Sequence, residues 1–189
     1  MMRILLQSLR LTVVFTVLTG LVYPLAITGA AQLAFRDRAN GSLVRRGGRV
    51  VGSALLAQKF ESPRYFWPRP SAADFATVPS GASNLGPTSQ ALQSNVIARA
   101  VALRAAHQRP SDAAVPADLL FTSGSGLDPH ISPAAARFQA ARVAAARGVS
   151  EDRVRELTES FVDPAEWGCL GEPRVNVLLL NLALDDATL

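Results

Sequence analysis

The longest apolar run of the chain lies near its start and predicts a helix that crosses a membrane. Residues 11–35 read LTVVFTVLTGLVYPLAITGAAQLAF and contain no charged side chain. A helix rises ~1.5 Å per residue, so this run spans ~37 Å, enough for a hydrocarbon core ~30 Å thick. A surface helix of a soluble protein would carry a polar stripe, and this run has none. Pro24 predicts a local kink near Tyr23.

A cleaved signal peptide is the alternative interpretation of this run. The apolar region of a signal peptide holds ~7–15 residues, fewer than this run contains. The small residues 28–31 are nevertheless compatible with a cleavage site. No later run is long and apolar enough to cross a membrane. The expected parts are a short N-terminal tail (1–10), a single transmembrane helix (11–35) and a globular domain (36–189).

The pattern after the span mixes strand and helix signals and predicts one mixed α/β (α+β) soluble domain. Gly47 and Gly48 predict the turn of a short hairpin over 44–51. In 92–107, apolar residues recur on one face of a helix, and Ser132 and Ser150 are placed to cap two further helices. The remaining apolar runs are 50–60, a strand or short helix, 118–122, a short element, and 171–185, a central strand with a polar end.

The composition gives no sign of nucleic-acid binding or of a metal centre. The formal net charge is +4, but the arginines are scattered and no basic block is interleaved with aromatic residues. Cys169 is the only cysteine, which excludes an internal disulfide and a cysteine-based zinc site. The two histidines, His107 and His130, lie too far apart in the sequence to form a histidine-rich metal motif.

The charges that flank the span leave the orientation of the domain open. Arg3 and Arg10 precede the span, whereas five arginines follow it within 36–49. Applied literally, the positive-inside rule keeps the domain in the cytoplasm. Long domains are nevertheless translocated largely regardless of their charge, so the residues alone decide neither side.

The loops of the domain contain no catalytic motif. Residues 123–126 (SGSG) lack both the Lys-Ser/Thr ending of a phosphate-binding P-loop and the full Gly-x-Ser-x-Gly of a nucleophile elbow. Segment 62–73 concentrates Tyr, Phe and Trp with arginine, which fits either a binding surface or the aromatic anchors of an irregular segment. A stand-alone membrane-tethered binding protein would purify without partners, and a secreted enzyme would lose residues 1–30 on export.

Two loops rich in glycine and serine carry the most specific motifs. They are 80–88 (SGASNLGPT) and 123–133 (SGSGLDPHISP), and they occur in order with 69–72 (RPSA), 115–119 (VPADL) and 181–184 (NLAL). With these motifs the chain resembles, from end to end, the C subunits (KdpC) of bacterial Kdp-type potassium-transporting ATPases.

The resemblance implies an accessory, non-catalytic subunit of a P-type ATPase complex that imports potassium with high affinity. The implied partners are a potassium-binding channel-like subunit, a P-type pump subunit and a small single-span subunit. The subunit is expected to be needed for assembly and to act as a catalytic chaperone that raises the affinity of the pump subunit for ATP. No cofactor is expected to be bound stably, and ATP would be met through the complex.

The implied topology is single-pass in the bacterial inner membrane, with a cytoplasmic N-terminus and an extracytoplasmic domain. ATP is in the cytoplasm, so an extracytoplasmic domain could not hold the ATP that the pump subunit hydrolyses. The alternative is therefore a docking or gating domain over the potassium entrance, without direct nucleotide contact. We expect the two loops mainly to dock the domain onto the channel-like subunit.

The resemblance carries two sets of site residues onto this chain, with no catalytic residue and no metal ligand. The implied nucleotide-binding residues are Ser80, Gly81, Ser83, Asn84 and Gln139. The residues expected to dock a partner are Tyr65, Phe66, Arg69, Ser123, Gly124, Ser125, Gly126 and Asp128. The family's nucleotide loop reads Ser-Gly-Gly-Ser-Asn, and Ala82 replaces its second glycine. Because alanine adopts positive φ far less readily than glycine, Ala82 disfavours a tight approach of the backbone to phosphate.

Overall fold

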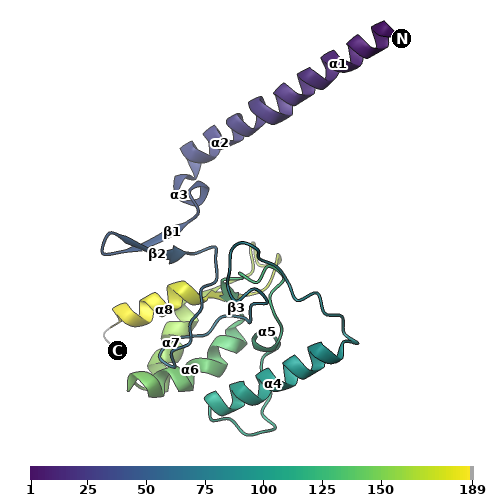
Figure 1. Ribbon diagram of the computed structural model, residues 1–189. Helices are drawn as coiled ribbons and strands as arrows, with labels where there is room; N and C mark the ends of the chain where they lie inside the picture. Colours follow the sequence, from purple (N-terminus) through teal and green to yellow (C-terminus); the bar gives the residue numbers. More distant parts are fainter. Residues whose placement is uncertain (188–189) are drawn as a thin grey trace. The chain divides into compact units, whose positions relative to one another are not determined.

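The structure, a computed structural model, describes residues 1–187 and divides the chain into two compact units (Figure 1). The first unit is Met1–Leu43 and the second is Val44–Leu189. The first consists of helices, and the second combines helices with two small sheets. The expected fold class, one N-terminal apolar helix plus a mixed α/β domain, is therefore confirmed.

The first unit is dominated by one continuous helix, Met2–Ala34. It comprises α1 (Met2–Val17), a π-helical turn η1 (Leu18–Val22) and α2 (Tyr23–Ala34), and the short helix α3 (Arg36–Ala39) follows. Its most apolar stretch has a mean hydropathy of 1.9 and is not buried by any other part of the structure. The helix is thus long and apolar enough to cross a membrane. Residues 2–10, which the sequence predicts as a separate tail, form the first part of the same helix.

The irregularity expected at Pro24 takes the form of the π-helical turn that precedes it. Proline has no N–H, and its ring clashes with the carbonyl four residues earlier, here that of Gly20. In the structure the N–H of Tyr23 bonds to the carbonyl of Leu18, five residues back. The wider turn accommodates the proline while the helix continues on both sides.

The second unit begins with a hairpin and continues with helices around a small antiparallel sheet. Its elements are β1 (Leu43–Arg46), β2 (Arg49–Ser53), α4 (Gln90–Ala106), α5 (Ala117–Leu120), β3 (His130–Ile131), α6 (Pro133–Arg147), α7 (Glu151–Ser160), β4 (Val162–Asp163), β5 (Arg174–Asn176) and α8 (Val177–Asp186). The strand order of the three-stranded sheet is β3-β5-β4. In β5, Val175 pairs with Ile131 on one side and with Val162 on the other.

Local signals placed several of these elements correctly. The hairpin β1–β2 turns at Gly47 and Gly48, both with positive φ. Helix α6 begins after Ser132, whose hydroxyl accepts a hydrogen bond from the N–H of Ala135, and ends at Gly148, which has φ +73°. Ser150 does occupy the cap position of α7, but its side chain makes no capping hydrogen bond.

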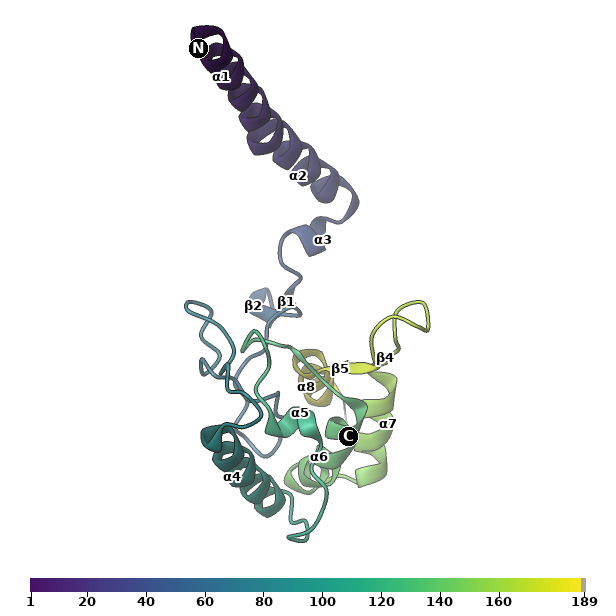
Figure 2. The same cartoon turned by 90° about the vertical axis from the view of Figure 1, so that its right-hand side faces the viewer.

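The core forms where alanine-rich α6 packs against α7 and β5 and where α8 packs against the same two elements, and Figures 1 and 2 show these helices grouped together. The buried residues of α6 include Ala135, Ala136, Ala140, Val143 and Ala144. Small side chains allow neighbouring elements to approach the helix closely, so the alanines contribute to packing.

The prediction of a central strand over 171–185 is wrong for most of its length. Only Arg174–Asn176 is a strand, and Val177–Asp186 is helix α8. The side chain of Asn176 accepts a hydrogen bond from the N–H of Leu179 and so caps the helix. The buried positions are Val177, Leu178, Leu180, Asn181 and Leu184. That spacing is helical, whereas the strand was inferred from a continuous apolar run, which does not distinguish the two.

An irregular backbone segment, residues 63–67, is fixed by side chains from α6 and α8. This segment forms no helix or strand, yet each of its five carbonyls accepts a hydrogen bond from a side chain. The bonds run from Arg142 to the carbonyls of Pro63 (2.6 Å) and Tyr65 (3.0 Å), from Arg147 to Arg64 (2.8 Å), from Asn181 to Phe66 (3.0 Å) and from Gln139 to Trp67 (3.1 Å). We call these four side chains and residues 63–67 the backbone clamp.

Asn181 tests the backbone clamp most directly, because its amide bonds to both backbone groups of Phe66. Its oxygen accepts from the Phe66 N–H at 2.8 Å and its nitrogen donates to the Phe66 carbonyl at 3.0 Å. Asn181→Leu would keep a similar volume but leave two buried polar groups unpaired. We expect the free energy of unfolding to fall by ~2–5 kcal/mol.

Chemical denaturation of the full chain in detergent would measure this loss. The control is Asn95→Leu, which makes the same change at an exposed position of α4. We expect the control to change stability by less than ~0.5 kcal/mol. Equal effects of the two substitutions would contradict the role of Asn181.

Candidate functional site

Three of the sequence motifs meet in the folded domain, and we call this meeting point the loop junction (69–72, 80–84 and 122–130). The N–H of Ser123 donates to the carbonyl of Pro70 at 3.1 Å. The hydroxyl of Thr122 donates to that of Ser83 at 3.2 Å. A Cβ atom placed on Gly126 would lie 2.9 Å from the carbonyl oxygen of Gly81. The two glycine- and serine-rich loops are therefore in direct contact.

An ion pair adds a charged contact to the loop junction. Arg69 and Asp128 approach to 3.0 Å, and the second carboxylate oxygen of Asp128 accepts from the backbone N–H of His130 at 3.0 Å. Burial raises the pKa of Asp128, but the hydrogen bonds from His130 and Arg69 outweigh it and hold the pKa below its usual value. The predicted docking residues Arg69 and Asp128 thus bind each other.

Asp118 holds the end of the second loop against α5. Its two carboxylate oxygens accept from the backbone N–H of Ser132 at 2.7 Å and from its hydroxyl at 3.1 Å. Across residues 1–187, His, Cys, Asp and Glu side chains form no group of three that could hold a metal ion.

Gln139, the glutamine expected to contact nucleotide, lies in the backbone clamp. It is fully buried. Its side-chain oxygen accepts from the N–H of Trp67 at 2.8 Å and from Arg142 at 2.9 Å, and its nitrogen donates to the Trp67 carbonyl. By contrast, Ser80, Ser83 and Asn84 are exposed. No hydrogen bond within the described chain joins Gln139 to 80–84, so the structure does not bring these predicted residues together.

Asn84 has the left-handed conformation in the first loop. Its φ is +52°. Asparagine tolerates positive φ better than most residues. The strained backbone position of this loop is therefore occupied by an asparagine.

The two aromatic docking candidates, Tyr65 and Phe66, belong to the backbone clamp, and hydrogen bonds of their side chains and backbone join them to α6 and α8. Phe66 is fully buried in the core. The hydroxyl of Tyr65 donates to Asp185 at 3.0 Å, and Asp185 also pairs with Arg147 at 2.9 Å. Burial and the hydrogen bond to Asp185 raise the pKa of Tyr65. The aromatic cluster of 62–73 thus mainly anchors an irregular segment, one of its two predicted roles.

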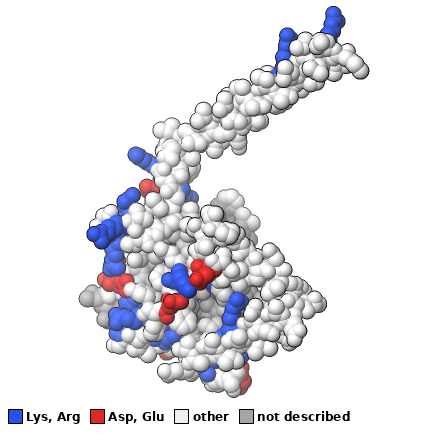
Figure 3. All heavy atoms as spheres, in the orientation of Figure 1, with Lys and Arg blue, Asp and Glu red and all other residues white. Residues whose placement is uncertain are grey.

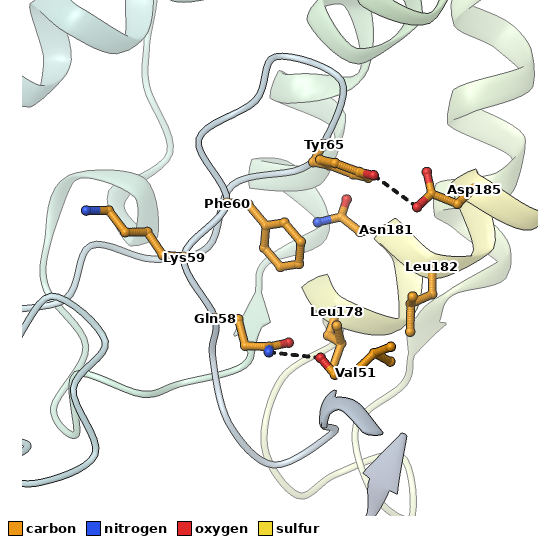
Figure 4. A pocket seen from close by; sticks show the side chains of 9 residues that line it. All are labelled: Val51, Gln58, Lys59, Phe60, Tyr65, Leu178, Asn181, Leu182 and Asp185. Atoms are coloured by element: carbon orange, nitrogen blue, oxygen red, sulfur yellow. Dashed lines mark hydrogen bonds between the residues drawn. The ribbon is translucent and has the colours of Figure 1, made fainter. Parts of the chain in front are cut away.

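A small cavity opens beside Tyr65 and is drawn in Figure 4. Its volume is about 260 Å³, and the side chain of Gln58 crosses it to donate to the carbonyl of Val51 at 3.1 Å. The lining residues are Val51, Gln58, Lys59, Phe60, Tyr65, Leu178, Asn181, Leu182 and Asp185. Most of its polar groups already serve the backbone clamp or the attachment of the hairpin, so we assign it no ligand.

A second, larger hollow lies between α4 and the segment that follows the backbone clamp. Its volume is about 530 Å³ and its walls are mostly apolar, including Phe60, Trp67, Phe75, Leu103 and Leu119. Lys59 at its edge pairs with Asp74 at 2.9 Å and with Glu61 at 3.2 Å.

His107 fastens the end of α4 to the backbone clamp. Its ring lies 5.5 Å from that of Trp67 and 4.8 Å from that of Phe138. Its Nδ1 donates to the carbonyl of Leu103 at 2.7 Å, which leaves Nε2 to accept from Arg142 at 3.0 Å. This arrangement requires a neutral imidazole. Burial, together with the charge of Arg142, lowers the pKa of His107 to about 4.

Many charged side chains of the domain lie next to groups of the opposite sign. Figure 3 shows positive and negative groups interspersed on the visible face, and the middle of the N-terminal helix carries none. Several pairs explain this balance, such as Arg137 with Glu159 at 2.6 Å and Arg155 with Glu151 at 2.6 Å.

Sequence reasoning missed the residues that organise the domain, above all Arg142, Asn181 and His107. The available signal was weak. An arginine in the middle of an alanine-rich helix, and an asparagine within a leucine-rich run, are polar residues at positions whose neighbours are apolar. A buried polar side chain needs a partner, but the sequence does not say which backbone group supplies it.

The fold combines a helix long and apolar enough to cross a membrane with a domain of mixed helices and strands whose glycine- and serine-rich loops meet at the loop junction. The sequence model of a family described as "K+-transporting ATPase, c chain" (KdpC) matches residues 5–186. A potassium-transporting ATPase KdpC subunit from Rhodospirillum rubrum is 56% identical over 189 residues, covering 98% of this chain and 97% of that protein.

Two further relatives give the same result. The KdpC subunit of Sorangium cellulosum is 58% identical over 184 residues, covering 95% of this chain and 96% of that protein. The KdpC subunit of Mycobacterium bovis is 50% identical over 187 residues, covering 98% and 99%. The chain belongs to the KdpC family of subunits of potassium-transporting ATPases.

Gly126 and Gly124 offer a matched test of the loop junction. Gly126 has φ +73°, and an added Cβ would lie 2.9 Å from Gly81 and 3.1 Å from the hydroxyl of Ser71. Gly124 has open space around it. We expect Gly126→Ala to lower the free energy of unfolding by ~2–4 kcal/mol and Gly124→Ala to change it by less than ~0.5 kcal/mol. Thermal unfolding of both variants would measure this, and similar values would refute the close approach.

His107 makes the stability of the domain depend on pH. An unfolded chain takes up a proton at the usual histidine pKa of 6.5, whereas the folded domain resists until about 4. The unfolded state therefore binds more protons in this range, and stability falls as the pH drops from 6.5 towards 4. We expect His107→Gln, which keeps a hydrogen-bond acceptor but does not titrate, to flatten the melting temperature across this range. An unchanged slope would show that another group is responsible.

Proposed function

We propose that this chain is a non-catalytic assembly and docking subunit of a potassium-transporting ATPase. In this proposal it raises the affinity of the complex for ATP through contacts with partner subunits, and it holds no ATP itself. A subunit can change the affinity of a distant site when its binding favours one state of the complex. The chain would thus act as a chaperone for ATP binding by docking onto its partners, without contacting the nucleotide.

One observation carries the proposal, namely the use that the domain makes of Gln139. This side chain is fully buried and bonds to both backbone groups of Trp67. A nucleotide contact would have to break these bonds and leave partly buried backbone groups unpaired, at a cost of up to ~1–3 kcal/mol for each group. The expected glutamine is thus better explained as part of the scaffold that displays the loops.

The proposed setting is the bacterial inner membrane, with the N-terminus in the cytoplasm and the domain outside. The apolar helix supports a single crossing by its length and composition. The proposed partners are the channel-like potassium-binding subunit, the pump subunit and the small single-span subunit. In that arrangement the domain would dock near the entrance for potassium, and the pump subunit would hold ATP on the other side.

Direct nucleotide contact is the second candidate, and the first loop is its support. Ser80, Ser83 and Asn84 are exposed polar residues in an ordered loop. Hydroxyl and amide groups of this kind can bind phosphate oxygens. The candidate requires this loop to act without Gln139, because that residue serves the backbone clamp.

The apparent KM for ATP of the purified complex distinguishes the two candidates. The variant combines Ser80→Ala, Ser83→Ala and Asn84→Gly, where glycine keeps the positive φ of position 84. We expect the complex to contain its subunits in the normal ratio and to keep its KM for ATP within about twofold of the wild type. A rise of about tenfold or more in a normally assembled complex, equivalent to ~1.4 kcal/mol, would favour direct contact.

A further inference from the structure

The segment between β4 and β5 presents a tryptophan to solvent. Trp167 is 90% exposed, and Leu170 beside it is 53% exposed. Figure 2 shows this segment extending as a narrow loop beyond the two strands. The other tryptophan, Trp67, belongs to the backbone clamp. Tryptophan offers a large apolar surface with one polar N–H and is enriched at protein interfaces, where that surface is covered.

The tip of the loop is held in one conformation. Glu166 and Leu170 form an isolated antiparallel bridge, with both backbone hydrogen bonds at 2.9 Å. Within it, the N–H of Gly168 bonds to the carbonyl of Ala165 at 3.0 Å and that of Cys169 to Glu166 at 3.3 Å. The exposed aromatic ring is therefore carried by a preformed turn. Preformed elements lose little conformational entropy on binding.

Trp167 occupies a backbone position that does not suit tryptophan. Its φ is +54°, and that of Gly168 is +75°. Tight hairpin turns with two consecutive positive φ angles strongly prefer Asn-Gly. A bulky residue at positive φ is strained and uncommon. The turn thus contains a residue that is unfavourable for local stability both in its conformation and in its exposure.

We propose that this turn, residues 164–173, is a docking element that inserts Trp167 into an apolar pocket of another subunit of the transport complex. The inference rests on the proposed docking function and names a surface for it. Tryptophan is the residue type most enriched among those that dominate binding at protein interfaces. A pocket wide enough for the indole, lined by apolar side chains, is the complementary surface.

The charges around Trp167 indicate a partner protein with a basic rim and argue against a lipid surface. The turn and the strands that frame it contain Asp163, Glu166 and Glu172 and one base, Arg174, which pairs with Glu166 at 3.3 Å. This region is acidic although the whole chain carries a net charge of +4. Surfaces that bind anionic lipid are basic. A pocket with arginine or lysine at its edge would complement the turn.

Trp167→Asn separates docking from a structural role. It creates Asn-Gly at the two positive-φ positions, so we expect the melting temperature of the full chain in detergent to stay equal or rise. Recovery of the partner subunits with the tagged chain after detergent washing should fall about tenfold or more. Trp167→Phe should restore part of this recovery. The control is Val101→Ala, which trims an apolar residue that is 60% exposed on α4 and should leave recovery unchanged.

Cys169 supplies a second measurement without any mutation, because it is exposed and lies two residues from Trp167. We expect N-ethylmaleimide to label it readily in the isolated full chain and slowly in the assembled complex. Normal recovery with Trp167→Asn, or equal labelling in both samples, would overturn the proposal for this turn and leave the docking function intact. Slow labelling of the isolated chain in phosphatidylcholine vesicles would assign the turn to the membrane and overturn it too. Failure of the unaltered chain to recover any partner would overturn both proposals.

Discussion

The domain depends on the need of backbone groups for hydrogen-bond partners where the chain forms no helix or strand. Residues 63–67 run past the core without forming a helix or strand, so they have no ladder to satisfy their carbonyls. Side chains of α6 and α8 take the place of that ladder, one donor for each carbonyl. Because Phe66 lies within this run and is fully buried, the clamp and the hydrophobic core depend on each other.

This dependence fixes the position of the loop junction. The clamped segment leads directly into 69–72, which supplies Arg69 to Asp128 and the carbonyl of Pro70 to Ser123. Loops without regular structure usually move, but these are tied to one another and, through the clamp, to the core. A scaffold of this kind suits a subunit whose partners must find its loops in a fixed arrangement. Gln139 has a role in this scaffold that needs no ligand, because its amide bonds to both backbone groups of Trp67.

The parts of the fold that sequence reasoning predicted are those with local causes. The apolar helix follows from one continuous apolar run, and the hairpin at Gly47 and Gly48 and the helix from Ser132 to Gly148 follow from signals within a few residues. The backbone clamp joins residues far apart in the chain, such as Asn181 with Phe66 and Gln139 with Trp67, and no short-range pattern encodes these pairs. The prediction of a strand in place of helix α8 fails for a related reason. Its apolar run is compatible with both, and the Asn176 cap that decides for a helix is recognised only when the first turn is known.

The candidate site likewise contains some features that the sequence predicts and others that only the structure shows. The sequence assigns nucleotide binding to residues of the first loop and docking to residues of the second. The structure brings the two loops together through Thr122 and Gly126. Tyr65 and Phe66 were expected on a docking surface, but their conspicuous aromatic character serves mainly the interior and its edge. The sequence does not single out Trp167, because one tryptophan between a glutamate and a glycine matches no motif. Only its conformation and exposure set it apart.

The strained backbone and the exposed side chain of Trp167 have one explanation in common. Proteins tolerate a locally unfavourable residue where function requires it and the rest of the fold is stable enough to support it. Here the stable part is the clamped core, and the unfavourable part is a turn at the end of two short strands. The turn can carry a strained, exposed tryptophan because its own conformation is closed by the Glu166–Leu170 bridge. A docking surface built in this way gains affinity from covering the aromatic ring, and it needs no rearrangement of the domain.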